Sequence, residues 1–424
     1  MNKYLDNVRT QYEQYPYPPR NPEDEQQRLI EIAIDQLSII NFYCFKGKQS
    51  FENVNILVAG GGTGDSTIFL AEQLRDKNSK VVYVDISKHS MAIAQQRAQK
   101  RKLTNIQWVH GSILSLSEYN LGLFDYISCT GVLHHLNDPK HGLHTLKSVL
   151  KPTGAMGIML YGKYGRSGVY QMQELMRLIN QKSTTLPEKI KNTRTVLDEL
   201  PESNWFQHNQ NFISDHDKLG DNGLVDLLLH EQDRSYSIDE IYQLLDSVNL
   251  RLVEFSSVKM RLSYRPEQYI QNKELISQIK KLSVRKQQHI AELLVGAFKK
   301  HEFFVSEKNN TKADFNDLNN IPFFHPHKTY HSLGQRISNQ IAKQSSNHIA
   351  LKHSSGYEFD LAADQLNYHF FKNINGEITL IEIFNKIRTG INGCKLTNSE
   401  ISKHLFPSYY KFEQLDWLLL KSQA

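Results

Sequence analysis

A glycine-rich stretch, Gly60-Gly61-Gly62-Thr63-Gly64, follows an apolar run and precedes a helical pattern. Glycines in a turn between a strand and a helix let a ligand approach the backbone, because no Cβ intervenes. The start of the following helix adds free N–H groups and partial positive charge. Asp65 stands where the dinucleotide fingerprint G-x-G-x-x-G has its third glycine. A carboxylate there would repel a pyrophosphate, so the sequence favours the methionine ammonium of S-adenosylmethionine (SAM).

Asp85 closes the next apolar run and is the second residue with a clear chemical use. One carboxylate offers two acceptor oxygens, so it can accept hydrogen bonds from both ribose hydroxyls of a nucleoside. Taken singly, the glycine stretch is compatible with an ordinary tight turn, and Asp85 with an ordinary helix start. Together they predict a nucleoside site.

Short apolar runs alternate with helical patterns over residues 51–164 and must position these groups. This rhythm predicts an α/β fold, a parallel Rossmann-like sheet covered by helices. Ligands bind such sheets beyond the carboxyl ends of the strands, where the glycine stretch and Asp85 both fall. The predicted strands are residues 55–59, 80–85, 106–110, 124–129 and 155–161.

The chain of 424 residues is long enough for several domains. We expect an aromatic and helical N-terminal arm, a SAM-binding core, a helical insertion that returns to the sheet, and a small C-terminal α or α+β domain of unknown role; these parts are residues 1–50, 51–164, 165–301 and 321–424. Finer patterns predict a helix within 23–45, a strand at 250–256, helices over 265–301, a polar linker at 307–320, and strand-then-helix segments near 357–371 and 378–387.

Three short motifs extend the pattern beyond Asp85. They read HGSIL from His110, CTGVLHHLNDP from Cys129 and LKPTG from Leu150. In this order, residues 56–161 resemble the class I SAM-dependent methyltransferases. The GVLHH form, YEQYPYPP near the N-terminus and LYGKYGRSGVYQMQELM from Leu160 look like a bacterial branch of that family, which includes tetratricopeptide-linked methyltransferases and protein-lysine methyltransferases. The resemblance runs over about residues 8–260 and not over 300–424.

The resemblance implies SAM as cofactor, with two departures from the family pattern. Val58 stands where the family usually has an acidic residue, and Ser112 where an Asp usually meets the adenine amino group. Ser112 can accept that hydrogen bond only without charge, which weakens the contact. The residues expected to contact the cofactor are Gly60, Gly61, Gly62, Thr63, Gly64, Asp65, Asp85, Ile86, Ser112, Ile113 and Thr130.

Methyl transfer needs alignment of acceptor, methyl and sulfur, and exclusion of water. The candidate catalytic residues are His135, Tyr161 and Tyr17. Of the neighbours His134 and His135, one should face the pocket and the other pack inward; we favour His135 for the pocket, and the alternative is a structural or positioning role for both. Further candidates are Tyr164 beside Tyr161 as an aromatic wall, Tyr12 and Tyr15 with Tyr17 as a lid, and, more weakly, His230, which is more typical of a packed histidine.

Several classes of site and location are disfavoured. The three cysteines and the His325, His327 and His331 group match no zinc spacing, so no metal is expected. The balanced net charge of +5 gives no sign of a nucleic-acid partner, and no apolar run is long enough for a membrane span. The N-terminus lacks a secretory pattern, which favours the cytoplasm. Thr130-Gly131-Val132 replaces the Asn/Asp-Pro-Pro-Tyr string of enzymes that methylate planar nitrogens.

These features lead to one leading hypothesis and three others. The first is a SAM-dependent methyltransferase with protein lysine side chains as candidate acceptors. The second is methylation of oxygen, nitrogen or carbon in a small molecule. A nicotinamide-dependent oxidoreductase is disfavoured by Asp65, and a non-catalytic SAM-binding or interaction module remains open. The expected partner is the methyl acceptor, and a homodimer is compatible with the unassigned C-terminal part.

Overall fold

The computed structural model describes residues 6–210, 212–309, 311–353 and 356–422. The chain forms two compact units. The first comprises residues 1–35, 51–252 and 263–307, and the second comprises residues 36–50, 253–262 and 308–424. Within the described ranges, none of the helices combines the length and apolar character that a membrane crossing requires.

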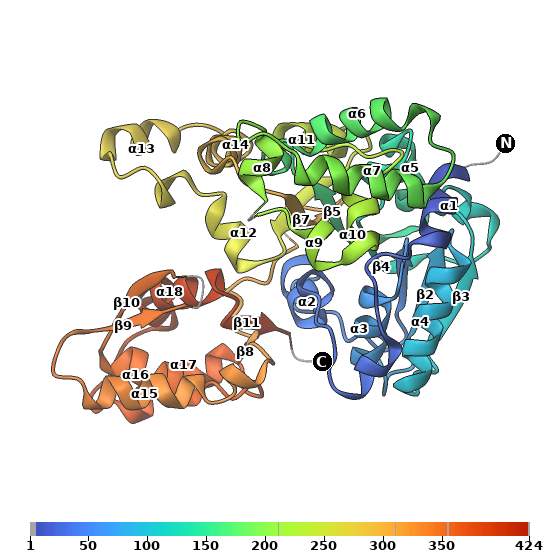
Figure 1. Cartoon of the computed structure of the whole chain (residues 1–424). Helices are drawn as coiled ribbons and strands as arrows, with labels where there is room; N and C mark the ends of the chain where they lie inside the picture. The colour runs from blue at the N-terminus through green and yellow to red at the C-terminus, as the bar shows by residue number, and fades with distance from the viewer. Residues whose placement is uncertain (1–5, 211, 310, 354–355, 423–424) are drawn as a thin grey trace. The chain divides into compact units, whose positions relative to one another are not determined.

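A seven-stranded sheet organises the first unit, in the order β3-β2-β1-β4-β5-β7-β6 (Figure 1). Strands β1 to β5 pair in parallel, and β7 pairs antiparallel with β5. The strand order reverses between β1 and β4, and such a switch point opens a ligand crevice at the carboxyl ends. The predicted Rossmann-like sheet is therefore confirmed. Its strands are β1 (Asn55–Ala59), β2 (Lys80–Asp85), β3 (Ile106–His110), β4 (Phe124–Thr130), β5 (Leu150–Tyr161), β6 (Arg251–Phe255) and β7 (Lys300–Ser306).

The central strands are nearly continuous apolar runs because both of their faces are covered. Helices α3 (Asp65–Gln73) and α4 (Lys88–Lys100) follow β1 and β2 and pack on each other. Helix α5 (Pro139–Ser148) joins β4 to β5. The side chain of Ser87 caps the start of α4, so the chain turns into a helix directly after Asp85.

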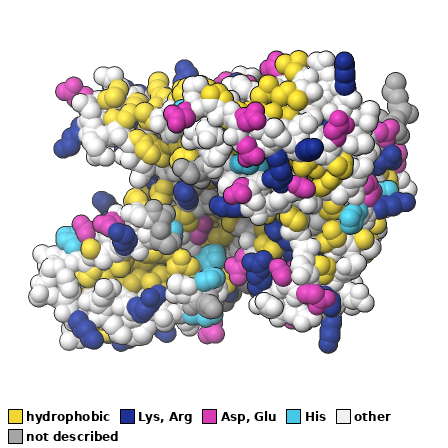
Figure 2. Space-filling model, in the orientation of Figure 1, with side chains coloured by type: hydrophobic (Ala, Val, Ile, Leu, Met, Phe, Trp, Pro, Cys, Tyr) yellow, Lys and Arg dark blue, Asp and Glu magenta, His cyan; other side chains and the backbone are white. Residues whose placement is uncertain are grey.

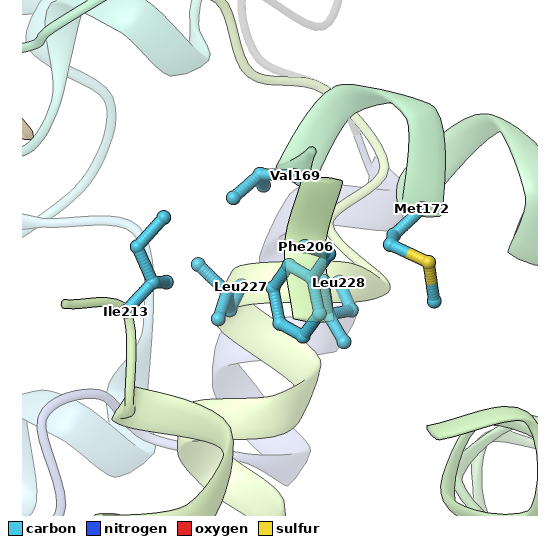
Figure 3. Packing of buried hydrophobic residues seen from close by; sticks show 6 residues of the cluster. All are labelled: Val169, Met172, Phe206, Ile213, Leu227 and Leu228. Carbon is cyan, nitrogen blue, oxygen red and sulfur yellow. The ribbon is translucent and has the colours of Figure 1, made fainter. Parts of the chain in front are cut away.

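The helices α6 to α10, which follow β5, form the insertion, which is the green group in Figure 1. They are α6 (Val169–Ile179), α7 (Leu186–Asp198), α8 (Trp205–Asn209), α9 (Asp215–Lys218) and α10 (Gly220–Leu228). The insertion has an apolar core of its own, to which α10 contributes Leu227 and Leu228 (Figure 3). This packing fixes the position of α10, the helix that brings a carboxylate into the site described below.

Helices α11 (Ile238–Asp246), α13 (Lys273–Ile279) and α14 (Val284–Val295) complete the first unit. Exposed apolar side chains gather over α13 and α14 (Figure 2), among them Leu275, Val284, Leu293 and Leu294. Apolar surface of this kind is typical of a face that another protein covers. The homodimer stays a prediction.

The second unit holds two small antiparallel sheets and most of the C-terminal helices. Strand β8 (Ile321–Phe324) pairs with β11 (Leu418–Lys421), and β9 (His348–Lys352) pairs with β10 (Glu358–Ala362). Its helices are α2 (Leu37–Cys44), α12 (Val258–Ser263), α15 (Leu333–Lys343), α16 (Gln365–Asn373), α17 (Leu380–Gly390) and α18 (Asn398–Gln414).

The structure corrects three sequence predictions of secondary structure. Within 23–45 only α2 is an α-helix, because the carbonyls of Ile34 and Asp35 accept from the side chains of Tyr126 and Gln73. Residues 378–387 contain no strand, since a capping box at Thr379 begins α17 there. Strand β7 was not predicted, because its partner β5 lies far away in the sequence.

Candidate active site

A cavity of about 570 Å³ lies within the first unit, at the carboxyl ends of the parallel strands. Its volume is in the range of small-molecule sites. The structure brings all the sequence-predicted site residues to its wall: Gly60, Gly61, Gly62, Thr63, Gly64, Asp65, Asp85, Ile86, Ser112, Ile113 and Thr130, together with Tyr17, His135 and Tyr161. Which of them contact a cofactor remains a prediction.

The glycine turn has a backbone that only glycine adopts easily. Gly62 and Gly64 have positive φ angles of +50° and +103°. A Cβ on Gly64 would lie 2.8 Å from the Cβ of Ala94, so α3 and α4 could not approach as they do. The N–H groups of Gly60 and Gly61 donate to the carbonyl of Val84, which ties the turn to the end of β2.

The carboxylate of Asp85 lies directly beside this turn. Its Oδ2 accepts from the N–H of Gly62 and its Oδ1 from that of Ser87, both at 2.8 Å. Burial raises the pKa of Asp85, although these two hydrogen bonds oppose the rise. Each oxygen keeps a second lone pair, so the group can still accept two ribose hydroxyls. The donor set thus fits the nucleoside part of SAM.

Asp65 has partners that the sequence did not predict. Its oxygens accept from Arg20 at 2.6 and 2.8 Å and from Arg97 at 2.7 Å. Burial alone would raise the pKa of Asp65, but the two arginines lower it overall. Arg97 also pairs with the buried Glu25 at 2.6 Å. The charge of Asp65 is therefore already compensated by protein, and its contact with the methionine ammonium stays a prediction.

The N-terminal arm contributes to the cavity wall through Tyr12 and Tyr17. The hydroxyl of Thr63 donates to the carbonyl of Pro18 at 2.7 Å. The carboxylate of Glu13 accepts from the first two N–H groups of α4, at 2.7 and 2.9 Å. Tyr15 instead packs against the apolar cluster of α7 and α10, which corrects its predicted place in the lid. The arm is thus bound to the glycine turn and to the start of α4.

Replacing Arg20 with alanine is expected to loosen the arm and weaken SAM binding about tenfold, because one charged hydrogen-bond pair on a partly exposed side chain contributes about 1.4 kcal/mol. The dissociation of S-adenosylhomocysteine should become faster by a similar factor in stopped-flow measurements. Arg9→Ala, which removes a cation from the exposed side of the same arm, is the control. Equal release rates for Arg20→Ala and the unaltered chain would contradict the role of the arm.

Four side chains from four elements meet at the carboxyl ends of β4 and β5: Tyr12, His135, Tyr161 and Asp226. Tyr12 donates to Asp226 Oδ1 at 3.0 Å and Tyr161 to Oδ2 at 3.2 Å. His135 Nε2 lies 3.5 Å from the Tyr12 hydroxyl. Three strand spacings of about 4.8 Å separate β2 from β5, so this group lies roughly 14 Å along the sheet from the strand of Asp85.

The peptide groups of Gln232 fix the tautomers of two stacked histidines, His135 and His230. The carbonyl of Gln232 can only accept, so His135 Nδ1, at 3.1 Å, carries the proton and Nε2 has a free lone pair. The N–H of Gln232 donates to His230 Nδ1 at 3.0 Å, so His230 Nε2 carries the proton. Burial lowers the pKa of His135 to about 4, which keeps the ring neutral near pH 7.

His135, Asp226 and His230 also lie within 4.8 Å of one another, a spacing that could suit a metal ion. A metal would need the Nε2 lone pair of His230, and the Gln232 N–H leaves that nitrogen protonated. The donor set therefore does not fit a metal. His230 instead donates to the Tyr12 hydroxyl at 3.2 Å.

Sequence reasoning missed Asp226 and misplaced Tyr164. Asp226 lies within Leu224–Leu228, and a carboxylate inside an apolar helical run is the signal that could have identified it. Tyr164 does not line the cavity. His134 is fully buried and stacks on Tyr161 at 3.9 Å, so His135 faces the pocket and His134 packs inward.

The side chain of Ser112 already has a partner, because its Oγ accepts from the N–H of Leu114 at 3.2 Å.

Known proteins are similar to this chain in sequence. Residues 57–156 match the model of a methyltransferase domain family. An uncharacterised protein of Synechococcus sp. is 27% identical over 310 residues, which are 72% of each chain. The tRNA 5-carboxymethoxyuridine methyltransferase of Escherichia coli is 30% identical over 115 residues, and the match covers 27% of this chain and 42% of that enzyme.

A solved structure, PKMT2 from Rickettsia typhi in complex with AdoHcy, is similar in fold over 96% of this chain and 78% of that one, with a TM-score of 0.63 and 17% identity. The sheet order and the site define a class I methyltransferase fold. Together with the family match, they show that the chain carries a SAM-dependent methyltransferase domain.

Proposed function

We propose that this methyltransferase acts on the amine of a protein side chain, with lysine as the leading candidate. The observation that carries the proposal is the group beside β4 and β5, where a carboxylate and a neutral histidine line the same cavity as three tyrosines. Aromatic rings favour a cation and its aliphatic stem. The similarity in fold to PKMT2 over most of the chain also supports a protein acceptor.

The roles of the site residues follow from their positions. Bound SAM supplies an electrophilic methyl carbon on its sulfonium. The glycine turn and Asp85 bind and orient the nucleoside, and Tyr12 and Tyr17 of the arm exclude water from the cavity. His135 Nε2, with its free lone pair, can accept a hydrogen bond from the acceptor nitrogen and orient it. Tyr161 holds Asp226 and forms the aromatic wall.

Incubation with methyl-labelled SAM and a cell lysate tests the proposal. Label should enter acid-precipitable protein, and hydrolysis should yield methylated lysine. Asp85→Asn serves as the negative control. It leaves the acceptor end of the cavity intact, and the label should fall because SAM binding is weakened. Label confined to small molecules would favour the alternative of a small-molecule acceptor. SAM binding with no labelled product would favour a non-catalytic module.

A further inference from the structure

Asp226 carries a buried carboxylate that has only neutral hydrogen-bond donors. The residue is 5% exposed, and its two carboxylate oxygens accept from tyrosine hydroxyls. The nearest guanidinium, that of Arg166, pairs with Asp233 at 3.2 Å and lies over the ring of Tyr161 at 3.7 Å. Among the described residues, no lysine or arginine lies within ion-pair distance of Asp226. Burying a charge without a counterion destabilises the folded state, unless a ligand brings the opposite charge.

We propose that Asp226 binds the ammonium of the methyl acceptor and takes its proton before methyl transfer. This inference rests on the proposed function and narrows it. Asp226 lines the cavity next to His135, so a cation entering there can contact its oxygens. A phenolate or enolate acceptor would meet like charge instead. Asp226 therefore selects amine acceptors over acceptors that react as oxygen or carbon anions.

The proton balance is simple. The acceptor enters as R–NH₃⁺ and forms an ion pair with the carboxylate. One proton passes to Asp226, which becomes a neutral carboxylic acid, and the nitrogen regains the lone pair that it needs as a nucleophile. The methylated amine leaves as a cation once more, and Asp226 returns its proton to solvent when the cavity opens.

The surroundings of Asp226 suit this exchange. Burial raises its pKa to about 6, and the attraction of Arg166 and the tyrosine hydroxyls offset the rise only in part. A carboxylate of that strength is a better base near neutral pH than an exposed one. The titratable and charged groups around it are Tyr12, Tyr17, His135, Tyr161, Arg166, His230 and Asp233.

Binding of n-butylammonium, a mimic of the lysine stem, tests the proposal without turnover. In calorimetry, the complex with S-adenosylhomocysteine should bind n-butylammonium and not n-butanol. Asp226→Asn should weaken this binding at least tenfold while leaving the affinity for S-adenosylhomocysteine within about twofold, which also shows that the variant is folded. The matched control is Asp221→Asn, which removes an exposed carboxylate of the same helix, α10, that pairs with Arg194 of α7.

Proton release gives a second readout. A cation beside Asp226 lowers its pKa, so binding should release about half a proton at pH 6 and close to none at pH 8. Equal n-butylammonium affinity in Asp226→Asn, or equal binding of n-butanol, would overturn the inference. If amine binding depends on Asp226 while no label enters protein, the inference stands and the protein acceptor fails.

Discussion

Replacing Asp85 with asparagine is expected to weaken SAM binding by about a hundredfold or more, because two charge-assisted hydrogen bonds contribute roughly 3 kcal/mol together. An amide keeps one acceptor oxygen and adds an NH₂ group. Since the two carboxylate oxygens of Asp85 already accept from Gly62 and Ser87, the NH₂ must face one of those N–H groups. The substitution thus disturbs the glycine turn as well as the ribose contacts.

Calorimetry with SAM and with S-adenosylhomocysteine measures this loss, and circular dichroism shows whether the variant is folded. Asp76→Asn, an exposed acid after α3, is the matched control and should bind SAM as the unaltered chain does. Unchanged affinity in Asp85→Asn would contradict the role of Asp85. It would also remove the basis for placing the nucleoside at the end of β2.

That the glycine turn and Asp85 line one cavity was predictable because these signals are local in sequence. The glycine turn lies within five residues, and Asp85 follows a buried strand directly. Each strand of the predicted sheet is a short apolar run between helices, so the period of the pattern also fixed the fold class. Burial and backbone conformation at these positions depend on near neighbours in the chain.

The acceptor end was less predictable because long-range contacts build it. Asp226 meets Tyr12 and Tyr161 only when α10 packs into the core of the insertion, and Leu227 and Leu228 hold it there. The partners of Asp65 likewise come from the arm and from α4. Strand β7 was not predicted for the same reason, because its partner β5 lies more than a hundred residues earlier in the chain. No periodicity in the sequence encodes such pairings.

The buried carboxylate of Asp226 lowers the free energy of unfolding at neutral pH. The pKa of Asp226 rises from an ordinary 3.8 to about 6 on folding. Between these values the unfolded chain has lost a proton that the folded chain keeps, so the folded state loses relative stability as pH rises from 3.8 to about 6. The loss saturates above pH 6 at about 3 kcal/mol, since each pKa unit corresponds to about 1.36 kcal/mol.

Asp226→Asn lacks this titration and is therefore expected to gain stability over the unaltered chain as pH rises. The difference in unfolding free energy between variant and unaltered chain should grow by about 2 kcal/mol from pH 4 to pH 7 and stay level above that. Urea unfolding at a series of pH values measures it, with Asp221→Asn as the control for replacing an exposed carboxylate of the same helix. A constant difference for Asp226→Asn would show that this carboxylate is not strained by burial. We therefore expect Asp226→Asn to gain stability and to lose amine binding. Both effects have one cause, because the buried carboxylate that we propose to bind the acceptor is also a charge whose burial makes folding less favourable.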